Sequence, residues 1–143
     1  MRWMGLDIGD KTIGVAVSDP LFISAQGVTT VERIGIKKDT SRLIEMIKEY
    51  DVDTVVSGLP LMLDGSDSPQ TEKVREFVTR LENKARSSGL KLSFVFQDER
   101  FTTKIAENVL IEANMRREKR KTIIDRQAAV IILQSYMDAN RRS

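Results

Sequence analysis

The sequence predicts an α/β fold in which a mixed sheet of five strands is flanked by helices. Three observations lead to this prediction. The chain begins with two alternating apolar segments around a short polar turn, which is typical of a β-hairpin. Short apolar segments then alternate with longer ones whose apolar residues recur at helical spacing. Its 143 residues suffice for a substantial core, and we expect a single domain over residues 1–143.

The predicted hairpin comprises residues 3–9 and 12–18. Its favoured register pairs Ile8 with Ile13, because a slip of one residue would mix the two faces. One face is then apolar, and the other carries a single carboxylate, Asp7. That carboxylate is surrounded by small residues: Gly5, Gly9, Gly14 and Ala16. Small residues let another backbone or a ligand approach closely. Asp is disfavoured within strands, so Asp7 either shapes the hairpin or belongs to a metal or phosphate site.

The middle of the chain adds two strands and a helix. Residues 26–31 are rich in Val and Thr and predict a third strand. Asp39 or Thr40 caps a helix whose apolar face extends to Tyr50. Residues 54–58 are short and apolar and end in glycine, which indicates a buried parallel strand.

Three helices and a strand complete the predicted fold. Ser68–Pro69 begins a helix that ends near Gly89. A fifth strand covers residues 90–96, a helix follows from Thr102 or Thr103, and the last helix runs from residue 122 to about 140. Three strands followed by alternating helices and strands is the order of ribonuclease H-like proteins, although other small α/β folds could accommodate it.

Composition excludes several kinds of chemistry. The chain has no cysteine and no histidine, so disulfides, thiolate zinc sites and imidazole-based catalysis are excluded. A bound metal would be a hard ion held by carboxylates, namely Mg²⁺ or Mn²⁺. The net charge of +2 says little about partners. No apolar segment is long enough to span a membrane, and we expect a soluble cytoplasmic protein without a membrane partner.

Carboxylates from distant parts of the chain are the candidate catalytic groups. Asp98 and Glu99 follow the fifth strand, at the sheet edge where α/β proteins bind ligands. Asp125 precedes Ala128 and Ala129 by three and four residues, so it shares the core-facing side of the last helix. Simpler roles are a favourable interaction with a helix dipole for the first pair and a buried salt bridge for Asp125. If Asp7 joins them, the acids could hold two ions about 4 Å apart and hydrolyse phosphodiesters.

Basic residues are concentrated between the predicted site and the last helix. Residues 116–121 contain five Lys or Arg among six, which is either a solvated loop or a phosphate-binding segment. We expect this segment and the loop at residues 59–67 to form walls for a substrate on either side of the site. The expected nucleic-acid contacts are Lys11, Arg100, Arg116, Arg117, Lys119, Arg120 and Lys121.

Four stretches resemble one family over nearly the whole chain. They are residues 6–19, Gly58–Leu61 with Gly65, residues 98–107, and residues 124–134. Together they are similar to the YqgF/RuvX family of pre-16S ribosomal RNA nucleases, which resemble RuvC Holliday junction resolvases. Three positions depart from the family pattern: Thr12, Met62 and Phe101 stand where Arg, Asn and Leu are usual.

The resemblance implies a ribonuclease H-like nuclease for structured nucleic acid, with Asp7, Glu99 and Asp125 as catalytic acids. Asp98 is a further expected metal ligand. The expected role is processing of the 5′ end of pre-16S rRNA, and resolution of branched DNA is the main alternative. Two other classes remain open. One is a nucleotide-binding domain of the actin and hexokinase type, and the other is a non-catalytic RNA-binding module.

Overall fold

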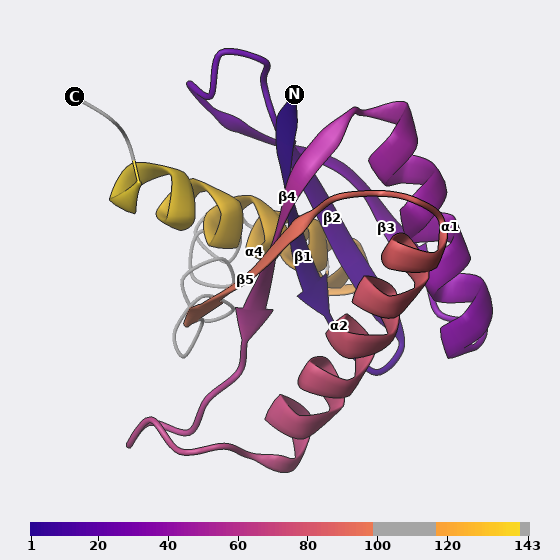
Figure 1. Cartoon of the computed structure of the whole chain (residues 1–143). Helices are drawn as coiled ribbons and strands as arrows, with labels where there is room; N and C mark the ends of the chain where they lie inside the picture. The colour runs from indigo at the N-terminus through magenta and orange to yellow at the C-terminus, as the bar shows by residue number, and fades with distance from the viewer. Residues whose placement is uncertain (99–116, 141–143) are drawn as a thin grey trace.

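The computed structural model describes residues 1–98 and 117–140, with side chains for 1–98 and 127–140. Five strands form one sheet in the order β3-β2-β1-β4-β5 (Figure 1). The hairpin strands and β3 pair antiparallel, whereas β4 and β5 run parallel to β1. The elements are β1 (Arg2–Ile8), β2 (Thr12–Ser18), β3 (Ala25–Glu32), α1 (Ile36–Glu49), β4 (Val52–Leu59), α2 (Pro69–Ser87), β5 (Ser93–Asp98) and α4 (Arg117–Ala139). This is the predicted mixed, five-stranded, ribonuclease H-like arrangement.

The hairpin has the predicted register. Ile8 pairs with Ile13, and Asp7 pairs with Gly14. The Gly9 amide donates to the Thr12 carbonyl over 2.9 Å and closes the turn. Because side chains alternate along a strand, this register separates the apolar face from the face that carries Asp7.

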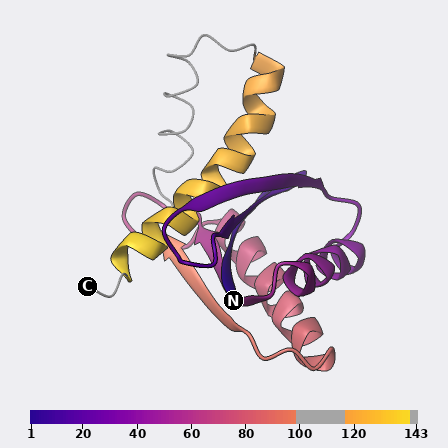
Figure 2. The same cartoon turned by 90° about the horizontal axis from the view of Figure 1, so that it is seen from above.

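Helices cover both faces of the sheet (Figure 2). Helices α1 and α2 lie on one face, and α4 crosses the other. The first face buries the larger core, which includes Leu6 and Ile8 of β1 and Phe77 of α2. The α4 face has a smaller cluster around Ala16, Ala129 and Leu133. Among the described helices, none is long and apolar enough to cross a membrane.

The predicted start of α1 was wrong. The helix begins at Ile36 with Gly35 as its N-cap, and Asp39 and Thr40 are buried inside its first turns. The Asp39 carboxylate reaches backward and accepts a bond from the Ile34 amide over 3.0 Å. Gly35 has φ 134°, a conformation that favours glycine and lets the chain turn into the helix earlier.

Helix α2 has the predicted ends, and the way it ends moves the start of β5. Ser68 is the N-cap, and Gly89 follows the helix with φ 78°. The Leu90 amide bonds the Ala85 carbonyl over 3.0 Å, and the Gly89 amide bonds the Arg86 carbonyl over 3.1 Å. These two bonds form a Schellman ending. Gly89 and Leu90 therefore terminate the helix, and the strand predicted over 90–96 begins only at Ser93.

Helix α4 begins earlier than predicted, at Arg117 instead of residue 122. Residues 117–121 are consequently helical and do not form a loop. Arg, Lys and Glu are good helix formers, and no Pro or Gly interrupts the segment, so the helix extends through it. The helix predicted from Thr102 or Thr103 lies outside the described residues.

Candidate active site

Asp7 lies near the carboxyl end of β1, half-buried, on the face that α4 covers. Its neighbour on β2 is Gly14. On β4, the register that pairs Leu6 with Ser57 brings Gly58 alongside Asp7. The carboxylate thus stands between two glycines, which leave space on either side of it. This is the environment of small residues that the hairpin pattern predicted.

The small residues also have a packing role. A Cβ atom on Gly5 would lie 2.7 Å from the Leu133 Cβ and 2.8 Å from the Ala129 carbonyl oxygen. Both distances are too short for any side chain, so α4 can cross β1 at this point only because residue 5 is glycine. The sequence allowed either a backbone or a ligand to approach this face, and at Gly5 it is the backbone of α4.

Asp98 is the last residue of β5 and is exposed. It pairs with Leu59, which contributes to the core beneath α1 and α2, as does Ile8. Alternation along β5 therefore turns Asp98 toward that face, away from the face of Asp7. Gln97 shares the face of Asp7 instead, since it pairs with Gly58. Because Asp98 and Asp7 face opposite sides of the sheet, we do not expect Asp98 to bind an ion held by Asp7.

The other two expected catalytic acids are described less fully. The backbone of Asp125 lies in α4, and the apolar stripe that follows it is buried as predicted at Ala128, Ala129 and Ile132. The Asp125 side chain and all of Glu99 lie outside the described residues. Within the described part of the chain, no three acidic side chains are grouped to hold a metal. The triad of Asp7, Glu99 and Asp125 therefore stays a prediction.

The expected basic contacts fall into two groups. Lys11 is exposed at the hairpin turn, beside the end of β1. Arg117, Lys119, Arg120 and Lys121 have helical backbones at the start of α4. Arg100 and Arg116 lie outside the described residues.

Sequence reasoning missed Arg33, which fixes the hairpin turn. Its guanidinium donates to the Gly9 carbonyl over 2.9 Å and to the buried Asp39 carboxylate over 3.1 Å. It also lies over the Phe77 ring, 5.0 Å from the centroid. The Arg33 amide donates to the Lys11 carbonyl over 2.9 Å. These bonds tie the turn after β1, next to Asp7, to the segment that precedes α1. Only the proximity of an Arg to a helix start could have suggested this.

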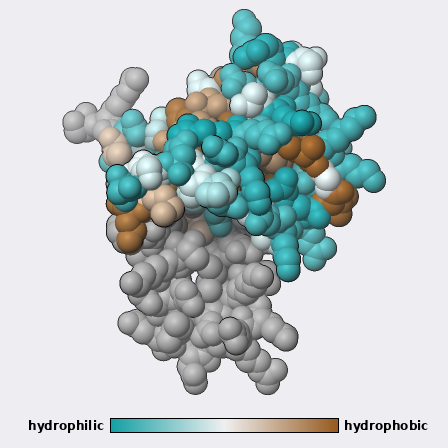
Figure 3. Space-filling model, turned by 90° about the horizontal axis from the view of Figure 1, so that it is seen from below, coloured by the Kyte–Doolittle hydropathy of each residue, from teal (hydrophilic) through white to brown (hydrophobic). Residues whose placement is uncertain are grey.

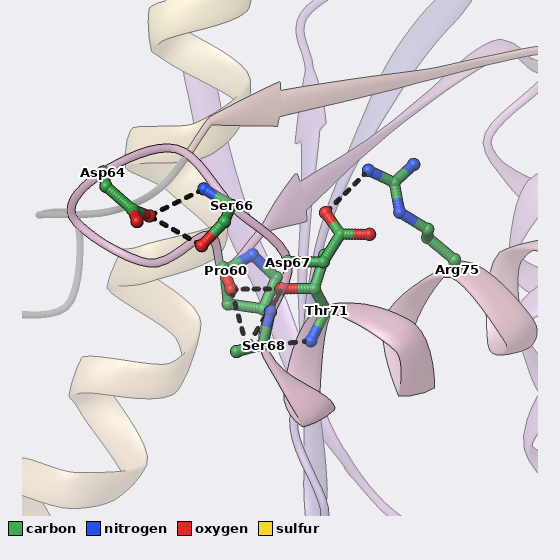
Figure 4. A network of polar contacts seen from close by, with 7 residues as sticks. All are labelled: Pro60, Asp64, Ser66, Asp67, Ser68, Thr71 and Arg75. Carbon is green, nitrogen blue, oxygen red and sulfur yellow. Dashed lines mark hydrogen bonds and ion pairs between the residues drawn. The ribbon is translucent and has the colours of Figure 1, made fainter.

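The loop between β4 and α2, residues 60–67, is closed by its own hydrogen bonds (Figure 4). At its base, the Pro60 carbonyl accepts from the Thr71 hydroxyl over 2.6 Å and from the Ser68 hydroxyl over 3.2 Å. At its tip, Asp64 accepts from the Ser66 amide and hydroxyl over 2.9 and 2.6 Å. These bonds define the shape of a segment that would otherwise be a flexible loop.

Holliday junction resolvases of known structure superpose on this chain over nearly its whole length. Thermus thermophilus RuvC bound to a Holliday junction superposes with a TM-score of 0.60 over 97% of this chain and 94% of that one, at 13% identity. The fowlpox virus resolvase with its junction DNA gives a TM-score of 0.59 over 99% of this chain and all of its own, at 16% identity. The fold is therefore that of RuvC-like, ribonuclease H-type proteins.

Sequence comparisons identify the family. The model described as "RuvX: Holliday junction resolvase" matches residues 1–139. A Clostridium novyi protein is 49% identical over 97% of this chain and 99% of its own length. A Clostridioides difficile protein is 50% identical over 96% and 94%. Both are named "Putative pre-16S rRNA nuclease". The chain belongs to the RuvX family, as its motifs predicted.

Proposed function

We propose that this chain is a metal-dependent nuclease that hydrolyses phosphodiester bonds in structured nucleic acid. The observation that supports this most is the position of Asp7. It is a half-buried carboxylate near the end of a central strand, between two glycines, on the face crossed by α4. The nuclease names of its full-length relatives support the same proposal.

The donor set suits a hard divalent ion. With no His or Cys in the sequence, oxygen atoms are the available ligands, and Mg²⁺ or Mn²⁺ prefers them. Asp7, Glu99 and Asp125 would hold the ion. When bound, such an ion activates water and stabilises the leaving oxygen. The backbone of β1, fixed by Arg33 at Gly9, would orient Asp7, and Lys11 with the basic start of α4 would attract phosphates.

The relatives' names make pre-16S rRNA the leading substrate, and we propose processing of its 5′ end. Resolution of branched DNA is the second candidate. It is favoured by the printed description of the family model and by the fold shared with junction-bound resolvases.

The decisive experiment supplies both substrates side by side. Purified protein is incubated with Mg²⁺ and either labelled precursor 16S RNA or a labelled four-way DNA junction. Metal-dependent cleavage of the RNA alone supports rRNA processing, and symmetrical cleavage of the junction alone supports resolution. Cleavage of neither, across Mg²⁺ and Mn²⁺ concentrations, would contradict the proposal of a nuclease.

A further inference from the structure

The exposed cations of α1 and α2 differ in whether an acid compensates their charge. Helix α2 has four cations that each form an ion pair over 3.1–3.6 Å: Lys73, Arg75, Arg80 and Arg86. The first half of α1 has three exposed cations: Lys37, Lys38 and Arg42. None of these three forms an ion pair within the part of the chain that the structure describes. Positive charge is therefore compensated along α2 and left uncompensated at the start of α1.

Two of these cations lie where they cost helix stability. Lys37 and Lys38 occupy the first turn of α1, where the partial positive charge of the helix dipole disfavours cations. The acid in the same turn, Asp39, is buried and already bonded to Arg33 over 3.1 Å. Because the two lysines are exposed, have no ion pair and oppose the dipole, the fold itself gives no reason for them. Their charge therefore indicates an interaction with a partner.

A fourth cation reaches the start of α1 from α2. The Lys84 ammonium donates to the Lys37 carbonyl over 3.3 Å. Lys38 and Arg42 are one helical turn apart, and both line a groove of about 360 Å³ between β3 and α1. The groove also contains the exposed acid Glu32, which the cations outnumber. We call the four cations the α1 basic cluster: Lys37, Lys38, Arg42 and Lys84.

The α1 basic cluster lies close to the end of β1. The Arg33 guanidinium bonds both the Gly9 carbonyl and the Asp39 carboxylate, so one side chain spans from the turn after β1 to the first turns of α1. Asp7 and α1 are on opposite faces of the sheet (Figure 2). The molecular surface at the edge where β1 and β4 end is mainly hydrophilic, with small hydrophobic areas (Figure 3). A nucleic acid held at Asp7 can therefore continue over the hairpin turn to the start of α1.

Phosphates match the charge and the spacing of this cluster. Lys37 and Arg42 are about 7.5 Å apart along the helix axis, and double-stranded DNA carries one charge per roughly 1.7 Å, so several phosphates can meet the cluster. We propose that the α1 basic cluster binds phosphates of a substrate arm that extends past the hairpin turn, away from the bond that is cleaved at Asp7. The substrate is then held on both faces of the sheet, by α1 and by the basic start of α4. This inference rests on the proposed function and specifies where its substrate binds.

The test measures binding without divalent metal, so that no cleavage occurs. Labelled precursor 16S RNA and a labelled four-way DNA junction are titrated with protein at several salt concentrations. On whichever of them the unaltered protein binds, the triple variant Lys37→Gln, Lys38→Gln, Arg42→Gln should bind at least about tenfold more weakly at about 0.1 M salt. The slope of log K against log salt should become less negative by about two to three, roughly one for each lost phosphate contact. Its melting temperature should be unchanged or higher, because cations in the first turn oppose the helix dipole.

The matched control is Lys48→Gln, Arg80→Gln, Arg86→Gln, which removes the same net charge from the last turn of α1 and from paired cations of α2. It should keep both the affinity and the salt slope of the unaltered protein. An unchanged slope in the cluster variant, or the same loss of affinity in both triple variants, would overturn the inference. Cleavage in Mg²⁺ together with an unchanged slope refutes the α1 basic cluster alone, whereas the expected change in slope without cleavage refutes the nuclease alone.

Discussion

The two faces of the sheet are built on different principles. The face under α1 and α2 buries large side chains such as Leu6, Leu43 and Phe77. On the face under α4, β1 contributes Trp3, Gly5 and Asp7, and the sheet contacts the helix through small residues such as Ala16. The first face maximises the apolar area removed from water. The second face carries smaller side chains. These allow α4 to approach the sheet closely and leave space around the carboxylate of Asp7.

This difference separates stability from function within one sheet. Substitutions on the α1 and α2 face should act mainly on the free energy of unfolding. Substitutions near Asp7 should act on metal binding and cleavage. A substitution at Gly5 should affect both stability and metal binding, since Gly5 lies two residues before Asp7 and directly under α4.

The largest expected effect on stability is that of Phe77→Ala. The ring is fully buried in the larger core and also lies under Arg33, so its removal leaves a cavity and a guanidinium without its stacking surface. We expect a loss of about 3–5 kcal/mol in the free energy of unfolding, measured by urea denaturation. Phe96→Ala is the control, because this ring is exposed beneath Arg75 and should cost less than about 1 kcal/mol. Similar losses for both variants would contradict the distinction between core and surface.

Arg33→Ala should have the next largest effect. It removes the partner of Asp39, which is 1% exposed, and the bond to the Gly9 carbonyl. A buried carboxylate that loses its cation is strongly destabilising, and we expect about 2–4 kcal/mol because Arg33 itself is partly exposed. Arg33→Lys keeps the charge but not the planar fork and should recover only part of the loss. If Arg33→Ala left the urea midpoint unchanged, the turn would not depend on this pair.

Gly5→Ala tests the close approach of α4. The added methyl group would lie within 3 Å of both Leu133 and the Ala129 carbonyl, so the helix would have to move. We expect a loss of about 1–3 kcal/mol in thermal or urea unfolding. Gly27→Ala, on the exposed edge strand β3, is the matched control and should be close to neutral. A neutral Gly5→Ala would mean that α4 is held loosely over β1.

A smaller effect on stability is expected from Asp19, at the other end of the sheet face that α4 covers. The Asp19 carboxylate accepts bonds from the amides of Ser24, Ile23 and Leu21, and these bonds hold its pKa below the ordinary value of 3.8 despite opposing desolvation. They shape the loop that places Phe22 against Trp3, with ring centroids 4.9 Å apart.

The sign of the pH dependence follows from this lowered pKa. The contribution of Asp19 to stability is present above its unfolded pKa and is lost as the pH falls through the lower folded pKa. Unfolding free energies of the unaltered protein and Asp19→Asn, measured from pH 6 downward, should therefore converge as the pH falls below about 4. A constant difference over this range would show that the charge of Asp19 does not stabilise the loop.

The sequence predicted the hairpin well because two physical signals agreed there. Alternation identified the apolar face, and the Asp10–Lys11 turn fixed the register, so the pairing of Asp7 with Gly14 followed from local pattern alone. The ends of α2 were equally predictable, since Ser68–Pro69 and Gly89 are strong local signals.

Other features were predicted less well, because competing local signals or the register of distant strands decided them. Asp39 suggested a helix cap, but Gly35 is the N-cap, and the Asp39 carboxylate bonds Arg33 and the Ile34 amide from inside the first turns. The basic segment at residues 117–121 suggested a loop, although its residues favour a helix and extend α4. The facing of Asp98 required the register of β4 and β5, which the sequence did not specify.

The most direct test of the account is Asp7→Asn. Asn is nearly isosteric and can keep the local hydrogen bonding, but it lacks the charge that a divalent ion requires. Mn²⁺ binding is measured by calorimetry and Mg²⁺-dependent cleavage on the better substrate, with Asp10→Asn as the control, an exposed acid that pairs with Lys73. We predict that Asp7→Asn loses Mn²⁺ binding and at least about a hundredfold of cleavage, with an unchanged or higher melting temperature without metal, while Asp10→Asn keeps both activities. Full cleavage by Asp7→Asn would contradict the assignment of the active site, and a large loss of stability without metal would show that Asp7 serves the hairpin instead.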